Sequence, residues 1–367
     1  MPNPQSTYVF KRAGVTTKNR LILAAMTNKQ SFDSGRISEA EIRWLVRRSQ
    51  GGFGIITTAA THVSKCGKAW EGEFGVFDDK FINPLNSLTR RIYEHGSLVI
   101  AQLFHGGMRS PEYLTGVQPV SASKVECKES FSGFSKKATQ DDIERIINDF
   151  SAAAQRCVKA GFDGVEIHSA HGYLISQFLS KTINQREDKW GGDLKGRSRL
   201  LIEIIQSIKR HVPENFIVGV RLSPEIINLG IFLNDSIELV KILKNVEIDF
   251  IHLSCWDIYA RSIEFPENPK TITEWFTSTI CNCPPIISTG NIWCSKDASN
   301  CMDQGSDFIG VARAAIPYPD WPKNIENADY HPSRGPFTIK QLEKARLSEP
   351  FIKYMRKWKG FIKNESR

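Results

Sequence analysis

The sequence of 367 residues lacks long apolar runs, and none approaches 18 residues, the length that a membrane-spanning helix requires. Its first residues, MPNPQSTYVFKRAG, lack the apolar core of a secretory signal peptide. No low-complexity linker or composition break divides the chain. We therefore predict a cytoplasmic protein without a membrane partner, folded as a single domain.

Clustered cysteines are also scarce, although the chain has eight cysteines in all. The only group lies between Cys281 and Cys301, and its spacing matches neither a zinc ribbon nor a ferredoxin. In a chain without an export signal this pattern favours reduced thiols over disulfides. We predict no metal site from these residues.

A dense basic block is missing outside the C-terminal KYMRKWKGFIKNESR, although the formal net charge is +8. Nucleic-acid-binding proteins concentrate Lys and Arg in one patch, so we predict no nucleic-acid partner. We interpret residues from about 338 to 367 as a C-terminal helical extension. Phe351, Tyr354 and Trp358 lie at helical spacing there, and they could pack on their own barrel or on a second copy in a homo-oligomer.

Short apolar runs alternate with longer helical patterns along the chain. Eight runs rich in Val, Ile, Leu and Phe have strand length, and they lie at residues 21–26, 53–60, 98–104, 164–168, 216–222, 249–254, 285–289 and 307–312. Continuous runs of this kind are typical of parallel strands that are covered on both faces. The count of eight predicts a (β/α)8 TIM barrel. A doubly wound sheet is less favoured because no G-x-G-x-x-G follows a strand.

Several of the helical patterns carry start signals. Ser38 with Glu41, and Thr139 with Asp142, have the spacing of a capping box. Later patterns lie at residues 197–211, 234–245 and 295–305. The segment from about 105 to 138 is instead rich in Gly, Ser and Pro. A connection of this length is usually functional or carries its own hairpin. It follows the third strand, so we expect it on the C-terminal face of the barrel, where such folds keep their active sites.

Polar residues follow most of the predicted strands and would converge at that face. Gly290, Asn291 and Arg313 follow the seventh and eighth strands, where barrels commonly bind phosphate. Gln102 is both donor and acceptor and suits the edge of a heterocyclic ring, while Arg221 could stabilise negative charge on such a ring. These residues together indicate a ring cofactor with a phosphate tail.

Six collinear segments resemble one family. They are KNRLILAAMT (18–27), QLFHGGMR (102–109), HSAHGYLISQFLSKTINQREDKWGG (168–192), VGVRLSP (218–224), STGN (288–291) and FIGVARAAIPYPDWP (308–322). The chain resembles the old yellow enzyme family of FMN-dependent ene-reductases over residues 18 to about 322. Lys181, Trp190 and the Met108 that precedes Arg109 depart from the usual pattern, and these departures bear on substrate preference.

The resemblance implies a barrel with non-covalently bound FMN and with NADPH or NADH as hydride donor. Ala25, Met26, Thr27, Ala60, Gln102 and Arg221 would contact the flavin ring, and Gly290, Asn291, Ala312 and Arg313 would hold the phosphate. The substrate would be a small activated alkene, an α,β-unsaturated carbonyl compound. His168 and His171 would donate hydrogen bonds to its oxygen, and Tyr173 would supply the proton.

Other interpretations of the same residues remain open. His105, His168 and His171 could serve a metal-dependent barrel hydrolase, although only Glu166 and Asp249 lie near strands as carboxylate partners. The chain could also bind a flavin without catalysis. The two histidines and the tyrosine could, finally, be ordinary core residues.

Overall fold

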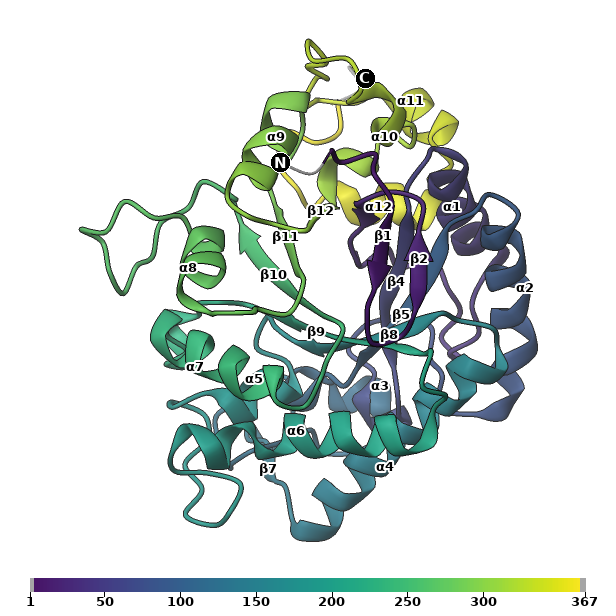
Figure 1. Ribbon diagram of the computed structural model, residues 1–367. Coiled ribbons are helices and arrows are strands. Elements are labelled where there is room, and N and C mark those ends of the chain that lie inside the picture. The colour runs from purple at the N-terminus through teal and green to yellow at the C-terminus, as the bar shows by residue number, and fades with distance from the viewer. Residues whose placement is uncertain (1–2, 364–367) are drawn as a thin grey trace.

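The computed structural model describes residues 3–363 and contains a closed barrel of eight parallel strands (Figure 1). The strands are β3 (Leu21–Leu23), β4 (Ile55–His62), β5 (Leu98–Phe104), β8 (Gly164–Ser169), β9 (Ile217–Leu222), β10 (Phe250–Trp256), β11 (Ile286–Gly290) and β12 (Phe308–Val311). Each pairs with the next, and β12 closes the ring on β3. The predicted (β/α)8 TIM barrel is thus confirmed. The first strand differs most, because β3 ends at Leu23 and the backbone then leaves the barrel wall.

Long helices surround the barrel and bury their apolar faces against it. They are α1 (Glu39–Gln50), α2 (Ile82–Tyr93), α4 (Gln140–Lys159), α6 (Leu194–His211), α7 (Leu233–Lys244), α8 (Ile272–Thr279) and α9 (Ser295–Asp303). Shorter elements are α5 (Leu174–Leu179), α10 (Trp321–Asn324) and the single turns η1 (Lys65–Gly67), η2 (Asp79–Phe81), η4 (Ile227–Leu229) and η5 (Arg313–Ala315). The sequence patterns did not single out α2 and α8.

The two predicted capping boxes have different outcomes. Thr139 and Asp142 form the predicted box at the start of α4. At α1, the Ser38 side chain accepts from the Glu41 N–H as predicted, but the Glu41 carboxylate does not reach back. It accepts instead from Asn28 Nδ2 (2.7 Å) and from Ser31 Oγ (2.5 Å). Glu41 therefore ties α1 to the loop that follows β3.

An N-terminal hairpin covers one end of the barrel. It consists of β1 (Tyr8–Phe10) and β2 (Val15–Thr17), which pair antiparallel and lie in front of the strands in Figure 1. Phe10 packs into the barrel interior against Phe308 and Phe250. Arg12 Nε donates to both carboxylate oxygens of Asp249 (3.0 and 3.1 Å). Because this end is closed, a ligand must enter from the other.

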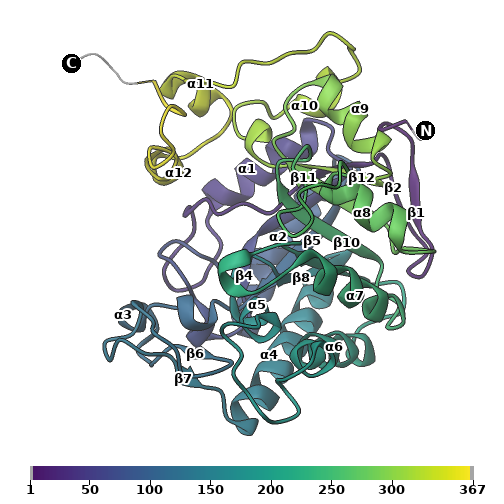
Figure 2. The ribbon, with the colours of Figure 1, turned by 90° about the vertical axis from the view of Figure 1, so that its left-hand side faces the viewer.

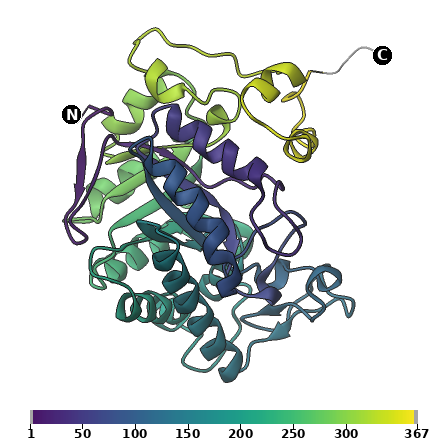
Figure 3. The same ribbon diagram turned by 90° about the vertical axis from the view of Figure 1, so that its right-hand side faces the viewer.

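Two appendages flank the open, C-terminal end. The segment after β5 holds η3 (Gly107–Arg109), α3 (Glu112–Thr115), β6 (Val120–Ser121) and β7 (Lys136–Lys137), and the end of the chain holds α11 (Ile339–Lys344) and α12 (Glu349–Met355). Both lie on the side away from the hairpin, at the left in Figure 2 and at the right in Figure 3.

The C-terminal extension packs on its own barrel over the residues described. The Phe351 ring lies 5.4 Å from the Trp44 ring of α1, measured between centroids, and is fully buried. α12 ends at Met355, so Trp358 follows the helix and does not continue its stripe. The last four residues of the predicted extension lie outside the described part of the chain. No helix within residues 3–363 combines the length and apolar character that a bilayer span needs.

Candidate active site

A cavity of about 260 Å³ opens at the C-terminal ends of the strands. All residues that the family resemblance implies for the flavin and the substrate line it: Ala25, Met26, Thr27, Ala60, Gln102, His168, His171, Tyr173, Arg221, Gly290, Asn291, Ala312 and Arg313. The described residues that line it include two arginines and no carboxylate. The cavity therefore suits an anionic ligand.

Arg221 is fixed against the floor of the cavity. Its Nη1 donates to the Ala25 carbonyl (3.1 Å) and its Nη2 to Ser254 Oγ (3.3 Å). Nε is buried and has no partner in the described part of the chain. Burial lowers the pKa of this guanidinium, and the charge of Glu166 opposes the shift, so Arg221 remains cationic at neutral pH. An orphaned cationic donor of this kind indicates an acceptor on the ligand.

His168 and His171 lie side by side, with ring centroids 5.0 Å apart. His168 Nδ1 accepts from the Ala170 N–H (3.2 Å), which assigns the proton of the neutral ring to Nε2. His171 Nε2 lies 2.8 Å from Ser254 Oγ. The Ser254 hydroxyl accepts from Arg221 and can donate its own proton to His171 Nε2, an arrangement that leaves the His171 proton on Nδ1.

Both imidazoles are neutral donors. Burial lowers the pKa of each ring well below its ordinary value, and for each ring the nearby positive charges act in the same direction. A neutral imidazole with one nitrogen occupied presents a single N–H to a ligand. The arrangement can therefore offer two hydrogen bonds to one oxygen atom.

The backbone at His171 is held in an uncommon conformation. His171 has φ of 62° and the following Gly172 has φ of 75°, both left-handed. The His171 carbonyl accepts from Arg109 Nη1 (2.8 Å), and its N–H donates to Ser223 Oγ (3.1 Å). A non-glycine residue in this region costs energy and persists only where its surroundings enforce it. These contacts turn the His171 side chain toward the cavity.

Tyr173 completes this wall just before α5. Its ring packs edge-on against Phe104, at 4.6 Å between centroids, and the Arg109 guanidinium lies 4.5 Å from its centroid. Burial raises the pKa of the phenol, and the Arg109 charge acts against the rise. Tyr173 is therefore protonated at neutral pH and can give a proton to a ligand.

Gly290 and Asn291 form a crowded turn at the far end of the cavity. A Cβ at Gly290 would lie 2.6 Å from the Asp257 nitrogen and 2.7 Å from the Trp256 carbonyl carbon, so the close approach that requires glycine is to the loop after β10. Asn291 has φ of 53°, and its Nδ2 donates to Asp257 Oδ2 (3.0 Å). Arg313 is exposed at the same end.

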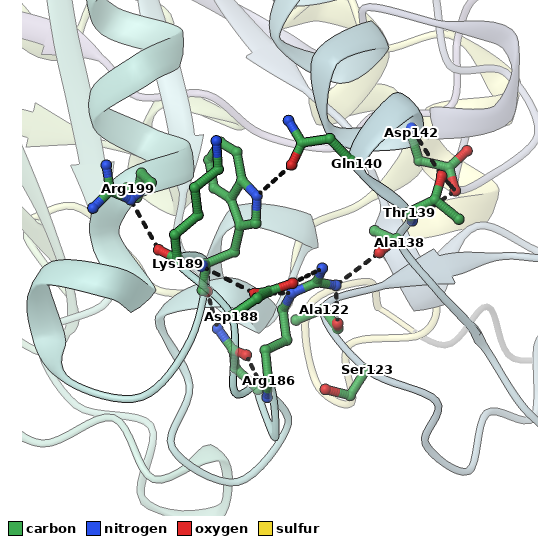
Figure 4. A network of polar contacts seen from close by, with 12 residues as sticks. Ala122, Ser123, Ala138, Thr139, Gln140, Asp142, Arg186, Asp188, Lys189 and Arg199 are labelled. Carbon is green, nitrogen blue, oxygen red and sulfur yellow. Dashed lines mark hydrogen bonds and ion pairs between the residues drawn. The ribbon is translucent and has the colours of Figure 1, made fainter.

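Residues 186–190, in the second half of the segment 168–192, make hydrogen bonds to neighbouring parts of the fold. Arg186 Nη1 donates to the carbonyls of Ala122 (2.9 Å) and Ala138 (2.7 Å), as Figure 4 shows. Trp190 Nε1 donates to Gln140 Oε1 (2.9 Å). These bonds join residues 186–190 to the segment after β5 and to α4. Lys181 pairs with Asp235 at 2.9 Å. Lys181, Trp190 and Met108 do not line the cavity, so their departures from the family pattern lie outside its wall.

The sequence did not identify the aromatic residues of the entrance. The cavity is also lined by Trp70 in the loop after β4, by Trp256 at the end of β10, and by Tyr354 and Trp358 in the C-terminal segment. Glu73 holds Trp70 in place, since its Oε2 accepts from the N–H groups of Ala69 (2.8 Å) and Trp70 (3.3 Å). In the sequence, Tyr354 and Trp358 were noted for their helical spacing, and nothing pointed to Trp70 or Trp256 as residues of the cavity.

The three-histidine metal site is not supported. His105 does not line the cavity, and its Nδ1 accepts from the Gly107 N–H (3.0 Å) while its Nε2 lies 3.6 Å from Cys66 Sγ. Within residues 3–363 no three His, Cys, Asp or Glu side chains are grouped as metal ligands.

The residues fit a flavin mononucleotide. Gln102 and the orphaned Arg221 Nε offer polar partners for the edge of a ring, Ala25 and Ala60 leave room for a flat group, and Arg313 offers a cation for a phosphate. A cavity with cations and without carboxylates also suits the charge of that cofactor.

Comparisons with known proteins agree with this fit. The sequence model of the NADH:flavin oxidoreductase / NADH oxidase family matches residues 10–331. The chain is 31% identical to a probable NADH-dependent flavin oxidoreductase of Bacillus subtilis, with 97% of this chain and 96% of that protein covered. It is 34% identical to an NADH:acrylate oxidoreductase of Vibrio harveyi over 86% of this chain, but it spans only 32% of that longer protein.

A solved structure, the old yellow enzyme homologue from Zymomonas mobilis, superimposes with a TM-score of 0.80 at 25% identity, covering 93% of this chain and 96% of that one. The chain therefore belongs to the NADH:flavin oxidoreductase / NADH oxidase family, the family of the old yellow enzymes, and is an FMN oxidoreductase that uses NADH or NADPH.

Proposed function

We propose that this protein reduces the activated C=C bond of small α,β-unsaturated carbonyl compounds. The observation that carries the proposal is the wall of the cavity formed by His168, His171 and Tyr173. It places two neutral N–H donors next to a protonated phenol, with ring centroids of His168 and Tyr173 5.1 Å apart.

The histidine pair supplies an electrostatic site for one oxygen. When hydride adds to the β-carbon of an enone, negative charge develops on the carbonyl oxygen. His168 Nε2–H and His171 Nδ1–H would both donate to that oxygen, as the donors of an oxyanion hole do. Because both rings are neutral before the reaction, they stabilise the developing charge without giving up a proton.

Tyr173 supplies the proton that the α-carbon then needs. The hydroxyl is within the same wall, and a phenol with a raised pKa stays protonated at neutral pH. Arg109, above its ring, would stabilise the phenolate that remains. Bound FMN supplies the hydride exchange itself, first from the nicotinamide and then to the alkene.

The purified protein tests this proposal directly. It should be yellow, its flavin absorbance should bleach anaerobically with NADPH or NADH, and the colour should return when 2-cyclohexenone is added. Bleaching without recovery by any enone would refute alkene reduction and leave a flavin oxidoreductase with another acceptor.

The role of Tyr173 can be separated from a structural effect. We expect Tyr173→Phe to slow enone-dependent reoxidation by at least a hundredfold and to leave flavin reduction by the nicotinamide within about threefold. Tyr113→Phe, at an exposed tyrosine of α3, is the matched control and should leave both half-reactions unchanged. Equal slowing of both half-reactions by Tyr173→Phe would remove Tyr173 from the role of proton donor.

A further inference from the structure

A chain of four polar side chains crosses the barrel interior beneath the cavity. Gln102 Nε2 donates to Glu166 Oε1 (2.6 Å), Glu166 Oε2 lies 2.6 Å from His252 Nδ1, and His252 Nε2 lies 2.7 Å from Thr289 Oγ1. Glu166 and His252 are 1% and 0% exposed. Gln102 and Thr289 line the cavity, whereas Glu166 and His252 lie below it. The chain of side chains therefore begins and ends at the cavity wall.

The strands that carry these residues show that the contacts cross the interior. Glu166 lies on β8 and His252 on β10, and β9 separates these strands in the barrel. Gly219 of β9 stands level with Glu166 in the register. A buried carboxylate is costly unless it is fully hydrogen-bonded or paired. Its presence at a position where barrels normally hold Val, Ile or Leu asks for a functional explanation.

The proton positions of the chain follow from its acceptors. Burial raises the pKa of Glu166, but the hydrogen bonds from His252 and Gln102 and the positive charge of Arg221 act against burial, and the pKa lies below its ordinary value. Burial lowers the pKa of His252. Glu166 is thus an anion that only accepts, and His252 is neutral with its proton on Nδ1. His252 Nε2 then accepts from the Thr289 hydroxyl.

An accepting Glu166 determines how the Gln102 amide is turned. The amide must present its NH₂ to the carboxylate, so its carbonyl oxygen is the atom available to the cavity. Without that carboxylate the amide could turn either way. The pyrimidine end of a flavin carries one N–H between two carbonyl groups, so an acceptor at this point matches the N–H.

We propose that Glu166, held by His252, is a positioning residue for the flavin. It fixes the Gln102 carbonyl as the acceptor for the flavin N3–H, and its buried charge makes the ring harder to reduce. This inference rests on FMN in the cavity and on the contact of Gln102 with its pyrimidine end, but not on the identity of the alkene.

The charge effect has a definite sign. Reduction makes the flavin ring richer in electrons, and a negative charge close below it in a medium of low dielectric disfavours that state. Arg221 acts in the opposite direction. Removing the charge of Glu166 while keeping its shape should therefore favour the reduced flavin.

Glu166→Gln performs that change with little disturbance to the chain. The new amide can accept from Gln102 through its oxygen and donate to His252 Nδ1 through its nitrogen, if the His252 proton moves to Nε2 and points at Thr289 Oγ1. Asp163→Asn is the matched control. Asp163 precedes β8 at the opposite end of the barrel, where its carboxylate accepts from the Val99 N–H (2.7 Å). Asp163→Asn therefore removes the same charge far from the cavity.

The reduction potential of the bound FMN is the first readout, measured anaerobically in the holoenzymes against reference dyes. We expect Glu166→Gln to shift the ratio of reduced to oxidised flavin at a fixed potential by at least tenfold toward reduced, about 30 mV for a two-electron couple. Asp163→Asn should change the ratio less than twofold. Glu166→Asp, which keeps the charge, should stay near the wild type.

Two results would overturn the charge effect: a change below twofold in Glu166→Gln, or an equal change in Asp163→Asn. The orientation of Gln102 is tested by the N3 proton resonance of isotope-labelled FMN in the holoenzyme. It should be shifted downfield as for a hydrogen-bonded proton in the wild type, and the shift should be lost in Gln102→Leu. A resonance that is the same in both proteins would overturn the positioning role. Neither measurement uses an alkene, so a failure of the proposed alkene reduction would leave both readouts intact.

Discussion

Glu41 offers a quantitative test of the contact between α1 and the loop that carries Thr27. Its side chain is fully buried, and its two oxygens accept from Asn28 and Ser31. Burial raises the pKa of this carboxyl from 4.5 to about 7, and the two hydrogen bonds offset only part of the effect. Burial therefore favours the protonated form of Glu41, although both hydrogen bonds favour the carboxylate.

The pH dependence has a fixed direction. Between pH 4.5 and about 7 the folded protein holds this proton and the unfolded chain has released it. Stability linked to Glu41 is thus complete below about pH 4.5 and is lost as the pH rises through about 7. A shift of this size corresponds to about 3 kcal/mol between the two protonation states.

Glu41→Gln removes the titration but keeps the shape and the capacity for two hydrogen bonds. We expect the variant to gain about 3 kcal/mol relative to the wild type between pH 4.5 and pH 8.5, or roughly 4 °C in the thermal midpoint of a chain of this length. The assay is a thermal melt of both proteins with saturating FMN at the two pH values.

Glu39→Gln is the control for this experiment. Glu39 lies on the same helix but is exposed and pairs with Arg91 (2.9 Å), so its replacement should change the midpoint by less than about 1 °C at either pH. If Glu41→Gln shifts the midpoint equally at pH 4.5 and pH 8.5, then Glu41 does not titrate in this range and the assignment of its charge is wrong.

Three further outcomes are expected. Because the pKa values of His168 and His171 are lowered, the rate of enone-dependent reoxidation should stay flat from pH 8 down to 6, and a fall centred near pH 6.5 would show that the pair titrates normally. Phe10→Ala, at the buried end of β1, should cost about 3–5 kcal/mol of stability in a denaturant melt, whereas Val9→Ala at the neighbouring exposed position should cost less than about 0.5 kcal/mol. Gly290→Ala forces a Cβ into the backbone of the loop after β10 and should raise the Kd of FMN at least tenfold in ultrafiltration, and normal retention would contradict this explanation.

The barrel was predictable because its strands follow a simple physical rule. Parallel strands covered on both faces read as continuous apolar runs, and all eight runs became strands. The rule placed the end of the first strand, β3, too far along the chain. LILAAM is apolar throughout, yet β3 stops at Leu23, and Ala25 turns its carbonyl to Arg221. Composition alone does not tell a strand from an apolar segment that leaves the sheet to receive a ligand.

The candidate site was predictable only where it lies at strand ends or in the family motif. Gln102, His168 and Arg221 belong to strands, and the barrel geometry brings such residues together wherever they occur. Trp70 instead reaches the cavity from a loop and Tyr354 from the last helix, while Trp256 lies at the end of β10, past a shift in the strand register. Their positions depend on local backbone conformation, such as the left-handed φ of 58° at Trp256, which periodicity does not encode.

The hydrogen-bonded chain from Gln102 to Thr289 was predictable only in part. Successive side chains of a strand alternate between its faces, so Glu166 and His168 point into the same interior from β8, and so do Phe250, His252 and Ser254 from β10. A charged or ionisable residue inside an apolar strand therefore indicates a buried partner, because burying it unpaired costs free energy. The sequence presented Glu166 only as an isolated carboxylate near a strand end. Its partner, His252, lies 86 residues further along the chain, and only the closure of the barrel shows that the two side chains meet beneath the site.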